Sequence, residues 1–248
     1  MNNLKYIKNL KIGNFKESIS TKKLFTIDKS KKILKNEVSS FIGYGPQGRS
    51  QSLNMRDQGY NAIIGVRKGN SWDKALNDGW IENKNLFNIE EACHKGTIIH
   101  YLLSDAGQSK VFPKIQNYLT KNKSLYFSHG FGIVYNKYTN INPPKNIDIF
   151  LVAPKGPGIE VRNHFLNNNP INASWAIHQD YSGDAVEKCL AVGFAIGCEN
   201  LFKTTFEKEV YSDLTGERSV LMGLLQGAFK AQYEVLRENG HSPIEAYN

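Results

Sequence analysis

The chain has 248 residues and a formal net charge of +8, from 31 Lys and Arg residues against 23 Asp and Glu residues. The charge is concentrated at the start: residues 1–40 hold ten Lys and three acids, whereas the other 208 residues carry 21 basic and 20 acidic groups. A nucleic-acid-binding core presents basic groups over a face, so this nearly neutral body excludes that class. Hydrophobic residues make up 40% of the chain, which excludes a wholly disordered protein.

The sequence lacks the features of a membrane or secreted protein. The longest apolar stretch, Leu190–Cys198, is about half as long as a transmembrane helix needs, and the first residues lack the apolar run of a signal peptide. Cys93, Cys189 and Cys198 form no CxxC pair, which is typical of buried thiols in a reducing compartment. We expect a cytoplasmic protein with no membrane or nucleic-acid partner; organellar import through the Lys-rich start is the alternative.

Six short apolar runs, rich in β-branched or aromatic residues, follow one another along the chain. They are Ser39–Ile42, Ala62–Val66, Thr97–Leu103, Leu125–Phe127, Ile147–Ala153 and Ala173–Ile177. Near-continuous apolar runs are typical of strands buried on both faces of a parallel sheet. Helix-compatible stretches separate them, for example Gln51–Gln58 and Asn88–Lys95. The alternation predicts an α/β fold with a Rossmann-like, doubly wound and mostly parallel sheet.

The same pattern continues to Phe206. Gly183–Ile196 is interpreted as a helix that starts at Ser182, and Leu201–Phe206 as a further strand. We therefore expect an NADP-binding Rossmann domain over residues 1–206, in which residues 1–33 form a basic N-terminal arm.

The pattern of apolar residues changes after this domain. Glu207–Glu238 contains no proline and has apolar residues at helical spacing, so it predicts mainly helix that ends near Asn239. Ser242 and Pro243 suit the cap and the first turn of another helix. We interpret residues 207–248 as the beginning of a truncated, all-helical C-terminal domain.

A glycine-rich loop follows the first of the six strands and precedes a helix. It consists of Gly43, Tyr44, Gly45, Pro46, Gln47 and Gly48. Glycines at this place allow a tight turn and let backbone N–H groups approach a pyrophosphate at the helix N-terminus. The loop predicts a dinucleotide site, and the alternative is a plain glycine-rich turn between strand and helix.

The end of the second strand bears on the choice of cofactor. An NAD enzyme usually has an acid there for the ribose hydroxyls, but this chain has Arg67, Lys68 and Ser71. Cationic and hydroxyl groups bind a 2′-phosphate, which an acid would repel. The pattern favours NADP, and a solvated basic loop is the alternative.

Two further turns follow strands of the same sheet. His129 lies in Ser-His-Gly-Phe-Gly at 128–132, and Lys155 lies between helix breakers in Ala-Pro-Lys-Gly-Pro-Gly at 153–158. Ligands of such sheets bind beyond the carboxyl ends of the strands, so His129 is a candidate reacting group and Lys155 a candidate ligand for an anionic or carbonyl oxygen. The alternatives are a structural histidine and a surface lysine.

Two carboxylates are spaced for a shared helix face. Asp213 and Glu217 are four residues apart in the predicted helix, and neighbouring carboxylates repel unless a cation joins them. Oxygen ligands without His or Cys nearby in the sequence suit Mg²⁺ rather than zinc. A solvated acidic face is the alternative.

Together and in this order, these segments resemble ketol-acid reductoisomerase (acetohydroxy acid isomeroreductase). The resemblance covers about Leu34 to Asn248. The more specific matches are Ala-Pro-Lys-Gly at 153–156, Glu-Val-Tyr-Ser-Asp-Leu-Thr-Gly-Glu-Arg at 209–218 and Gly-His-Ser-Pro at 240–243. Enzymes of this family use Mg²⁺ for an alkyl migration and NADPH for the reduction of 2-acetolactate or 2-aceto-2-hydroxybutyrate, in branched-chain amino-acid synthesis.

The resemblance also implies roles for individual residues. His129 and Lys155 match the family's active-site histidine and lysine, Asp213 the carboxylate that bridges two Mg²⁺ ions, and Glu217 a ligand of one of them. The further cofactor contacts that it implies are Arg67, Ser71, Asp105, Ala106, Gly107 and Gly158. The expected partner is a small 2-hydroxy-3-keto acid, and the full-length family forms homo-oligomers.

Two alternatives to this enzyme remain. A metal-independent 2-hydroxy-acid dehydrogenase with the same fold has no use for the pair Asp213 and Glu217. An NADP-binding remnant would bind the cofactor without turnover, because the family has further C-terminal helices that supply metal-binding acids and a substrate-binding serine. We expect residues 1–248 alone to bind NADPH but not to turn over 2-acetolactate at a normal rate.

Overall fold

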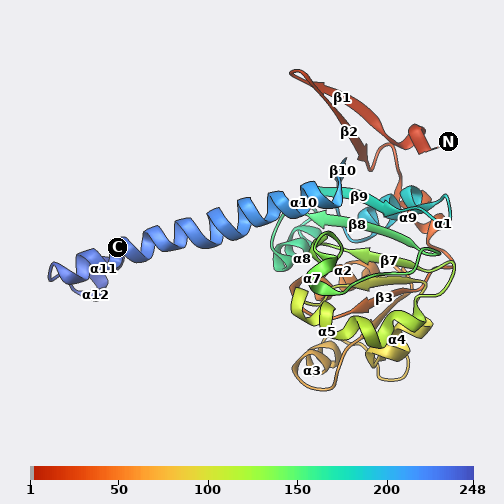
Figure 1. Ribbon diagram of the computed structural model, residues 1–248, viewed down its shortest axis with the longest axis horizontal. Helices are drawn as coiled ribbons and strands as arrows, with labels where there is room; N and C mark the ends of the chain where they lie inside the picture. The colour runs from red at the N-terminus through yellow and green to blue at the C-terminus, as the bar shows by residue number, and fades with distance from the viewer. Residues whose placement is uncertain (1–2) are drawn as a thin grey trace. The chain divides into compact units, whose positions relative to one another are not determined.

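The computed structural model describes residues 3–248 and divides into two compact units, one that ends at Phe206 and one from Glu207 to Asn248. The first unit is an α/β structure with one ten-stranded sheet and helices on both of its faces (Figure 1). Among the described residues, no helix has the length and apolar character that crossing a membrane requires.

Six strands of the sheet agree closely with the apolar runs of the sequence, whereas the first two strands and the short fifth strand were not expected. They are β1 (Lys8–Ile12), β2 (Phe15–Thr21), β3 (Ser39–Ile42), β4 (Ala62–Gly65), β5 (Leu86–Phe87), β6 (Ile98–Tyr101), β7 (Ser124–Phe127), β8 (Asp148–Pro154), β9 (Ala173–Gln179) and β10 (Asn200–Lys203). Their spatial order is β1-β2-β10-β9-β8-β7-β6-β3-β4-β5. The chain leaves β3 toward β4 on one side and returns to β6 on the other, which creates a topological switch point beside β3.

Strands β5, β4, β3, β6, β7 and β8 are parallel, and β9 pairs antiparallel with β8. The helices of this unit are η1 (Asn3–Tyr6), α1 (Ile27–Ile33), α2 (Pro46–Asp57), α3 (Asn70–Asn77), α4 (Ile89–Lys95), α5 (Asp105–Ile115), η2 (Gln116–Tyr118), α6 (Phe131–Val134), α7 (Asn136–Thr139), α8 (Gly158–Leu166) and α9 (Ala185–Ala195). The predicted Rossmann-like, mostly parallel sheet is confirmed.

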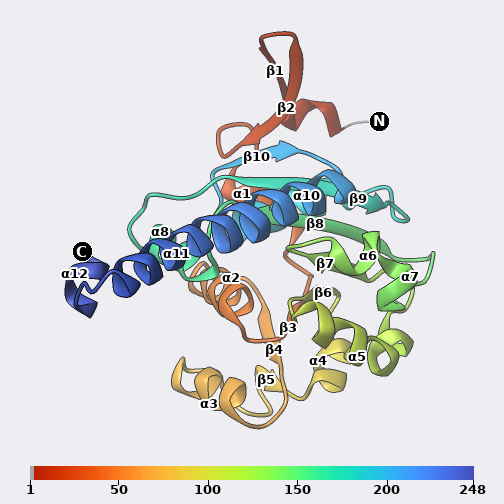
Figure 2. The ribbon, with the colours of Figure 1, turned by 60° about the vertical axis from the view of Figure 1, so that its left-hand side comes forward.

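Two hydrophobic cores lie on opposite faces of the sheet. Successive side chains of a strand point to opposite faces, and accordingly Phe41 packs in one core while Ile42 packs in the other. Helices α2 and α9 contribute to the core of Phe41, and α4, α5 and α6 contribute to that of Ile42. Figure 2 shows α2 and α5 on opposite sides of β3 and β6. Both faces of the central strands are therefore covered, which explains why their sequences are apolar throughout rather than alternating.

Of the residues expected to form a basic arm, those from 8 to 21 extend the edge of the sheet instead. β1 and β2 form a hairpin, and β2 pairs antiparallel with β10. After the hairpin, the ring of Phe25 stacks on Phe194 at a centroid distance of 5.5 Å, and the Ser30 hydroxyl donates to the Ala191 carbonyl at 2.8 Å. These contacts join segments more than 150 residues apart, which local sequence patterns do not reveal.

Two local expectations were wrong. Ser182 does not start α9; its backbone N–H and hydroxyl donate to the buried carboxylate of Asp148 at 2.9 and 2.7 Å, and the helix begins after Asp184. The strand expected up to Phe206 ends at Lys203, because Phe206 is buried in the core and begins the next helix. In both cases a tertiary contact outweighs the local pattern.

The second unit is helical, as predicted. After α10 (Phe206–Asp213) come the π-helix η3 (Leu214–Leu224), α11 (Leu225–Glu238) and α12 (Pro243–Tyr247). Ser242 caps α12 through a capping box with Glu245. The large apolar side chains Leu221, Met222 and Phe229 are 52%, 73% and 60% exposed, so this unit buries little of its own apolar surface.

Candidate active site

The glycine loop connects β3 to α2 and has no room for side chains at two of its positions. Gly43 has a φ of +103°, and a β-carbon there would lie 2.8 Å from the Leu102 carbonyl oxygen. A β-carbon on Gly48 would lie 2.2 Å from the Gly43 carbonyl oxygen. Gly45 precedes α2 and has no side chain with which to cap it, so the positive end of the helix dipole is open to an anion.

A cavity of about 420 Å³ adjoins this loop. Three strand ends line it: Gly43–Gly45 after β3, Val66–Ser71 after β4 and Leu102–Ser104 after β6. These are adjacent parallel strands, and the cavity lies at their carboxyl ends next to the switch point. Dinucleotides bind at this place in Rossmann-like sheets.

The predicted 2′-phosphate contacts lie in the wall of this cavity. Arg67 and Ser71 are exposed and flank Gly69, whose φ of +119° turns the chain into α3. Lys68 also lines the cavity, but its ammonium is 2.6 Å from a carboxylate oxygen of Glu82 and 3.6 Å from the centre of the Trp72 ring. The wall is cationic, which suits a phosphate group.

A polar network that the sequence did not reveal holds Tyr44 of the glycine loop. The Tyr44 hydroxyl donates to Asp78 at 2.8 Å and accepts from the Trp80 indole at 2.7 Å. Arg49 donates to both oxygens of Asp78, at 2.6 and 2.7 Å. These Arg49 bonds lower the pKa of Asp78, and burial raises the pKa of Tyr44. Asp78 belongs to no motif, so no signal in the sequence marks it.

The segment Asp105–Gly107 forms the first turn of α5. Ser104 caps that helix by accepting from the Gly107 N–H at 3.2 Å. The residues that line the cavity reach Ser104, which directly precedes the segment. The structure therefore puts Asp105, Ala106 and Gly107 beside the cavity wall and not in it.

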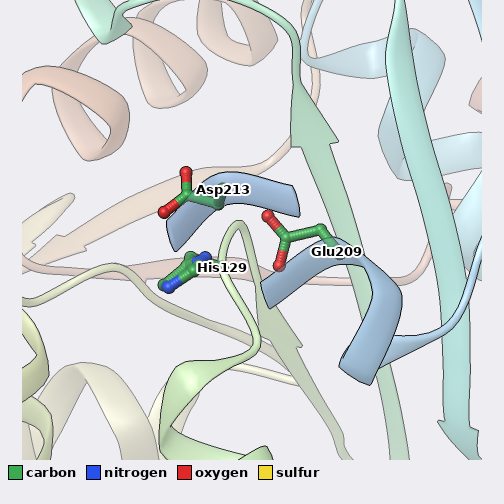
Figure 3. Close-up of side chains that lie close together, drawn as sticks. All are labelled: His129, Glu209 and Asp213. Carbon is green, nitrogen blue, oxygen red and sulfur yellow. The ribbon is translucent and has the colours of Figure 1, made fainter. Parts of the chain in front are cut away.

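His129 lies in the turn between β7 and α6 (Figure 3). Its side chain is half-buried, and its ring is nearly parallel to that of Phe131, with 6.2 Å between the centroids. β7 is the second strand from β3 in the sheet, so His129 stands at the same carboxyl edge as the glycine loop. The position expected from the sequence is confirmed; the chemical role of His129 remains a proposal.

Lys155 and Gly158 follow β8 at the same edge. Lys155 is exposed, and its ammonium is 5.7 Å from the centre of the Phe202 ring. Gly158 begins α8, and a β-carbon on it would lie 2.4 Å from the carbonyl carbon of Pro46 and 2.6 Å from the backbone nitrogen of Gln47. The structure thus brings the Lys155 turn into direct contact with the glycine loop, although more than 100 residues separate them.

The structure adds a third acidic residue to the pair that the sequence predicts in the second unit. Glu217 lies in the π-helix η3, which follows directly on α10. Asp213 also has an acidic neighbour on α10: carboxylate oxygens of Glu209 and Asp213 lie within 4.8 Å of each other (Figure 3).

The two carboxylates of α10 offer charged oxygen donors of the kind that Mg²⁺ binds. Glu209 is 4% exposed, and Asp213 is also 3.4 Å from Arg218 Nε. Sequence reasoning missed Glu209. The available signal was its position four residues before Asp213 in the motif at 209–218, which places both on one face of an α-helix.

The fold and the glycine loop define a Rossmann-like, NAD(P)-binding protein. Two family models match the chain: "Acetohydroxy acid isomeroreductase, NADPH-binding domain" over residues 33–201 and "Ketol-acid reductoisomerase, C-terminal domain" over residues 206–248. The chain belongs to the ketol-acid reductoisomerase family, and the resemblance noted in the sequence is confirmed.

Individual relatives support the same conclusion. The chain is 55% identical to a "Ketol-acid reductoisomerase (NAD(+))" of Desulfosudis oleivorans, over 96% of this chain and 68% of that protein. It is 50% identical to a mitochondrial ketol-acid reductoisomerase of Neurospora crassa, over 98% of this chain and 60% of that protein. The chain spans 53% to 68% of the length of its curated relatives.

A solved structure shares both the fold and the family. It is an NADH-preferring ketol-acid reductoisomerase from an uncultured archean, with a TM-score of 0.83 and 35% identity, which covers 92% of this chain and 69% of that chain. The names of the relatives and of the family models include both NAD and NADPH. Membership of the family therefore leaves the choice between the two cofactors open.

Proposed function

We propose that this protein acts as a ketol-acid reductoisomerase, which converts 2-acetolactate or 2-aceto-2-hydroxybutyrate to 2,3-dihydroxy acids in branched-chain amino-acid biosynthesis. One observation carries the proposal. The glycine loop, the His129 turn and the Lys155 turn all lie at the carboxyl edge shared by β3, β7 and β8, within the residues that the NADPH-binding family model matches. A hydride transfer needs the cofactor and the reacting groups at one such edge.

The proposed cofactor is NADPH. Arg67 and Ser71 would bind its 2′-phosphate, and the loop from Val66 to Ser71 contains no acid that would repel it. The pyrophosphate would bind at the N-terminus of α2, where Gly43, Gly45 and Gly48 allow close approach. Asp105–Gly107 and Gly158 are proposed as further contacts along the same edge.

Asp213, Glu217 and Glu209 are the residues proposed to hold Mg²⁺. Hard oxygen ligands of this kind fit Mg²⁺, and the proximity of Glu209 and Asp213 supports the assignment. When bound, a pair of Mg²⁺ ions lowers the pKa of the substrate's tertiary hydroxyl and polarises the adjacent ketone, as the alkyl migration requires. A metal-independent dehydrogenase would not use these acids.

The chain's own groups are proposed to act on the substrate as follows. His129 exchanges a proton with the substrate oxygen through an imidazole nitrogen. Lys155 binds an anionic or carbonyl oxygen of the substrate through its ammonium, which is exposed at the sheet edge and can reach a ligand there.

The test is oxidation of NADPH in the presence of 2-acetolactate, with and without Mg²⁺. Because the chain spans only part of its relatives, it is assayed alone and as a fusion with the remaining C-terminal part of the Desulfosudis relative. Mg²⁺-dependent turnover by the fusion that His129→Ala abolishes would support the proposal. Turnover that is independent of Mg²⁺ would favour the 2-hydroxy-acid dehydrogenase, and cofactor binding by the fusion without any turnover would favour the binding remnant.

A further inference from the structure

A buried glutamine on α2 connects the cofactor loop to the turn that carries His129. Gln51 is fully buried. Its amide nitrogen donates to the side-chain oxygen of Gln47 at 2.9 Å and to the Ser128 hydroxyl at 2.8 Å, and its amide oxygen accepts from the Tyr126 hydroxyl at 3.0 Å. Gln47 belongs to the glycine loop and Ser128 directly precedes His129, so one side chain contacts both motifs.

Most donors and acceptors of this cluster are paired with one another, which restricts the orientation of each side chain. Gln51 has two amide hydrogens, and both have acceptors. Ser128 accepts from Gln51 and can donate to the Tyr126 hydroxyl 3.0 Å away. The single phenol hydrogen of Tyr126 is shared between the Gln51 amide oxygen and the Val152 carbonyl oxygen, each 3.0 Å away. Burial raises the pKa of Tyr126 well above its ordinary value, so the phenol remains a donor. A buried cluster whose groups satisfy one another resists the loss of any member.

The same cluster reaches the third motif. The Gln47 amide donates to the Gly156 carbonyl at 3.3 Å, next to Lys155, and Gly158 lies against Pro46 and Gln47 with no space for a β-carbon. Gln47 therefore touches the Lys155 turn on one side and Gln51 on the other. Because the backbone around Gln47 is close-packed, a displacement of Gln47 must also displace the residues that it contacts.

We propose that Gln51 is a positioning residue that couples occupation of the glycine loop to the conformation of the Ser128–His129 turn. A pyrophosphate on the N-terminus of α2 fixes the backbone at Gln47, and Gln51 passes this restraint to Ser128 through its single amide group. His129 is thereby held in one orientation when the cofactor is bound. The inference rests on the proposed function for the identity of the cofactor and the role of His129, but the contacts of Gln51 are independent of both.

The test is hydrogen exchange, followed by mass spectrometry, with NADPH at the same fractional saturation of each variant. In the wild type, NADPH should slow exchange at 43–48 and at 128–132. In Gln51→Met, which has similar volume but no amide, protection at 43–48 should persist while protection at 128–132 falls by at least half. Gln58→Met is the matched control, because Gln58 caps the C-terminal end of α2 and its side-chain amide donates to the Asn54 and Ala195 carbonyls, away from the His129 turn; it should keep both effects.

Ser128→Ala provides a second variant if Gln51→Met does not fold. It removes the link from the other end while the bond between Gln51 and Tyr126 remains, and it should show the same loss at 130–132. If the cofactor still protects this turn fully in either variant, the coupling through Gln51 is wrong, while the proposed function is unaffected. Absence of protection at 43–48 in the wild type would instead refute the cofactor site of the proposed function, and the coupling with it.

Discussion

Gly158 lies so close to Pro46 that a β-carbon on Gly158 would stand 2.4 Å from the Pro46 carbonyl carbon. The first turn of α8 therefore packs directly on the first turn of α2, and the Lys155 turn is held against the glycine loop. Within the loop, a β-carbon on Gly48 would stand 2.2 Å from the Gly43 carbonyl oxygen, so the loop is also tightly packed against itself. The glycine loop is therefore constrained by Gly158 from outside and by Gly43 and Gly48 from within, at positions where only glycine fits.

Gly158→Ala should lower both stability and cofactor affinity. Forcing a methyl group into this contact should destabilise the protein by about 1–3 kcal/mol, as overpacking does, and should distort the loop at Gln47. Thermal unfolding and fluorescence titration with NADPH measure the two effects. Gly156→Ala is the control, since the nearest atom to its β-carbon would be a side-chain carbon of Ile171 at an ordinary 3.7 Å. Equal behaviour of the two variants would contradict the steric account.

Arg67→Asp should shift the cofactor preference from NADPH toward NADH. A charge-assisted hydrogen bond to a phosphate contributes about 1.5–3 kcal/mol, so NADPH affinity should fall about 10- to 100-fold while NADH affinity changes little. Lys84→Asp, an equal charge change at an exposed position outside the cavity wall, controls for the general field. If the wild type binds both cofactors equally in a fluorescence titration, the assignment of Arg67 and Ser71 to a 2′-phosphate is wrong.

Asp213→Asn should remove most Mg²⁺ binding, and Glu209→Gln should weaken it by a smaller factor. The physical reason is the loss of an anionic oxygen from a pair that lies within 4.8 Å, since Mg²⁺ prefers charged oxygen ligands. Isothermal calorimetry measures the affinity. Glu234→Gln is the control because Glu234 pairs with Lys230 on α11. Unchanged affinity in Asp213→Asn would exclude the metal role.

Asp78→Asn should destabilise the glycine loop in a pH-dependent way. The Arg49 bonds lower the folded-state pKa of Asp78, so its ionised form stabilises the protein above the ordinary pKa of about 3.9. This contribution is lost as the pH falls through the lowered folded-state pKa. The variant should therefore be less stable by about 1–2 kcal/mol at neutral pH, and the difference from wild type should shrink in acid. Chemical denaturation at several pH values checks this; a constant difference would contradict it.

The three cysteines should be unreactive in the folded protein. Cys93, Cys189 and Cys198 are fully buried, and burial raises the pKa of Cys93 and of Cys198 to about 12. Thiolates are the reactive form, so a thiol reagent at pH 8 should label the native protein far more slowly than the unfolded one. Rapid labelling of one cysteine under native conditions would show that its segment opens locally.

Sequence alone determined the parts of this protein that depend on neighbouring residues. The apolar runs that correspond to β3, β4, β6 and β7 were located nearly to the residue. Strands buried on both faces are apolar throughout, so their ends are marked by the first polar or glycine residue. The glycine loop and the Ser242 cap also follow from local backbone and capping preferences. The His129 and Lys155 turns were found because the carboxyl ends of parallel strands share an edge.

Tertiary structure decided what depends on distant partners. The N-terminal hairpin joins the sheet through β10, nearly 180 residues later, and Asp148 redirects Ser182 away from the helix cap. Asp78 holds Tyr44 across 34 residues, and Gln51 meets Ser128 across 77. A polar side chain that is buried must find its partners wherever the fold places them, and no local pattern encodes that choice. The candidate ligands are therefore readable in the sequence, but the residues that position them become visible only in the folded chain.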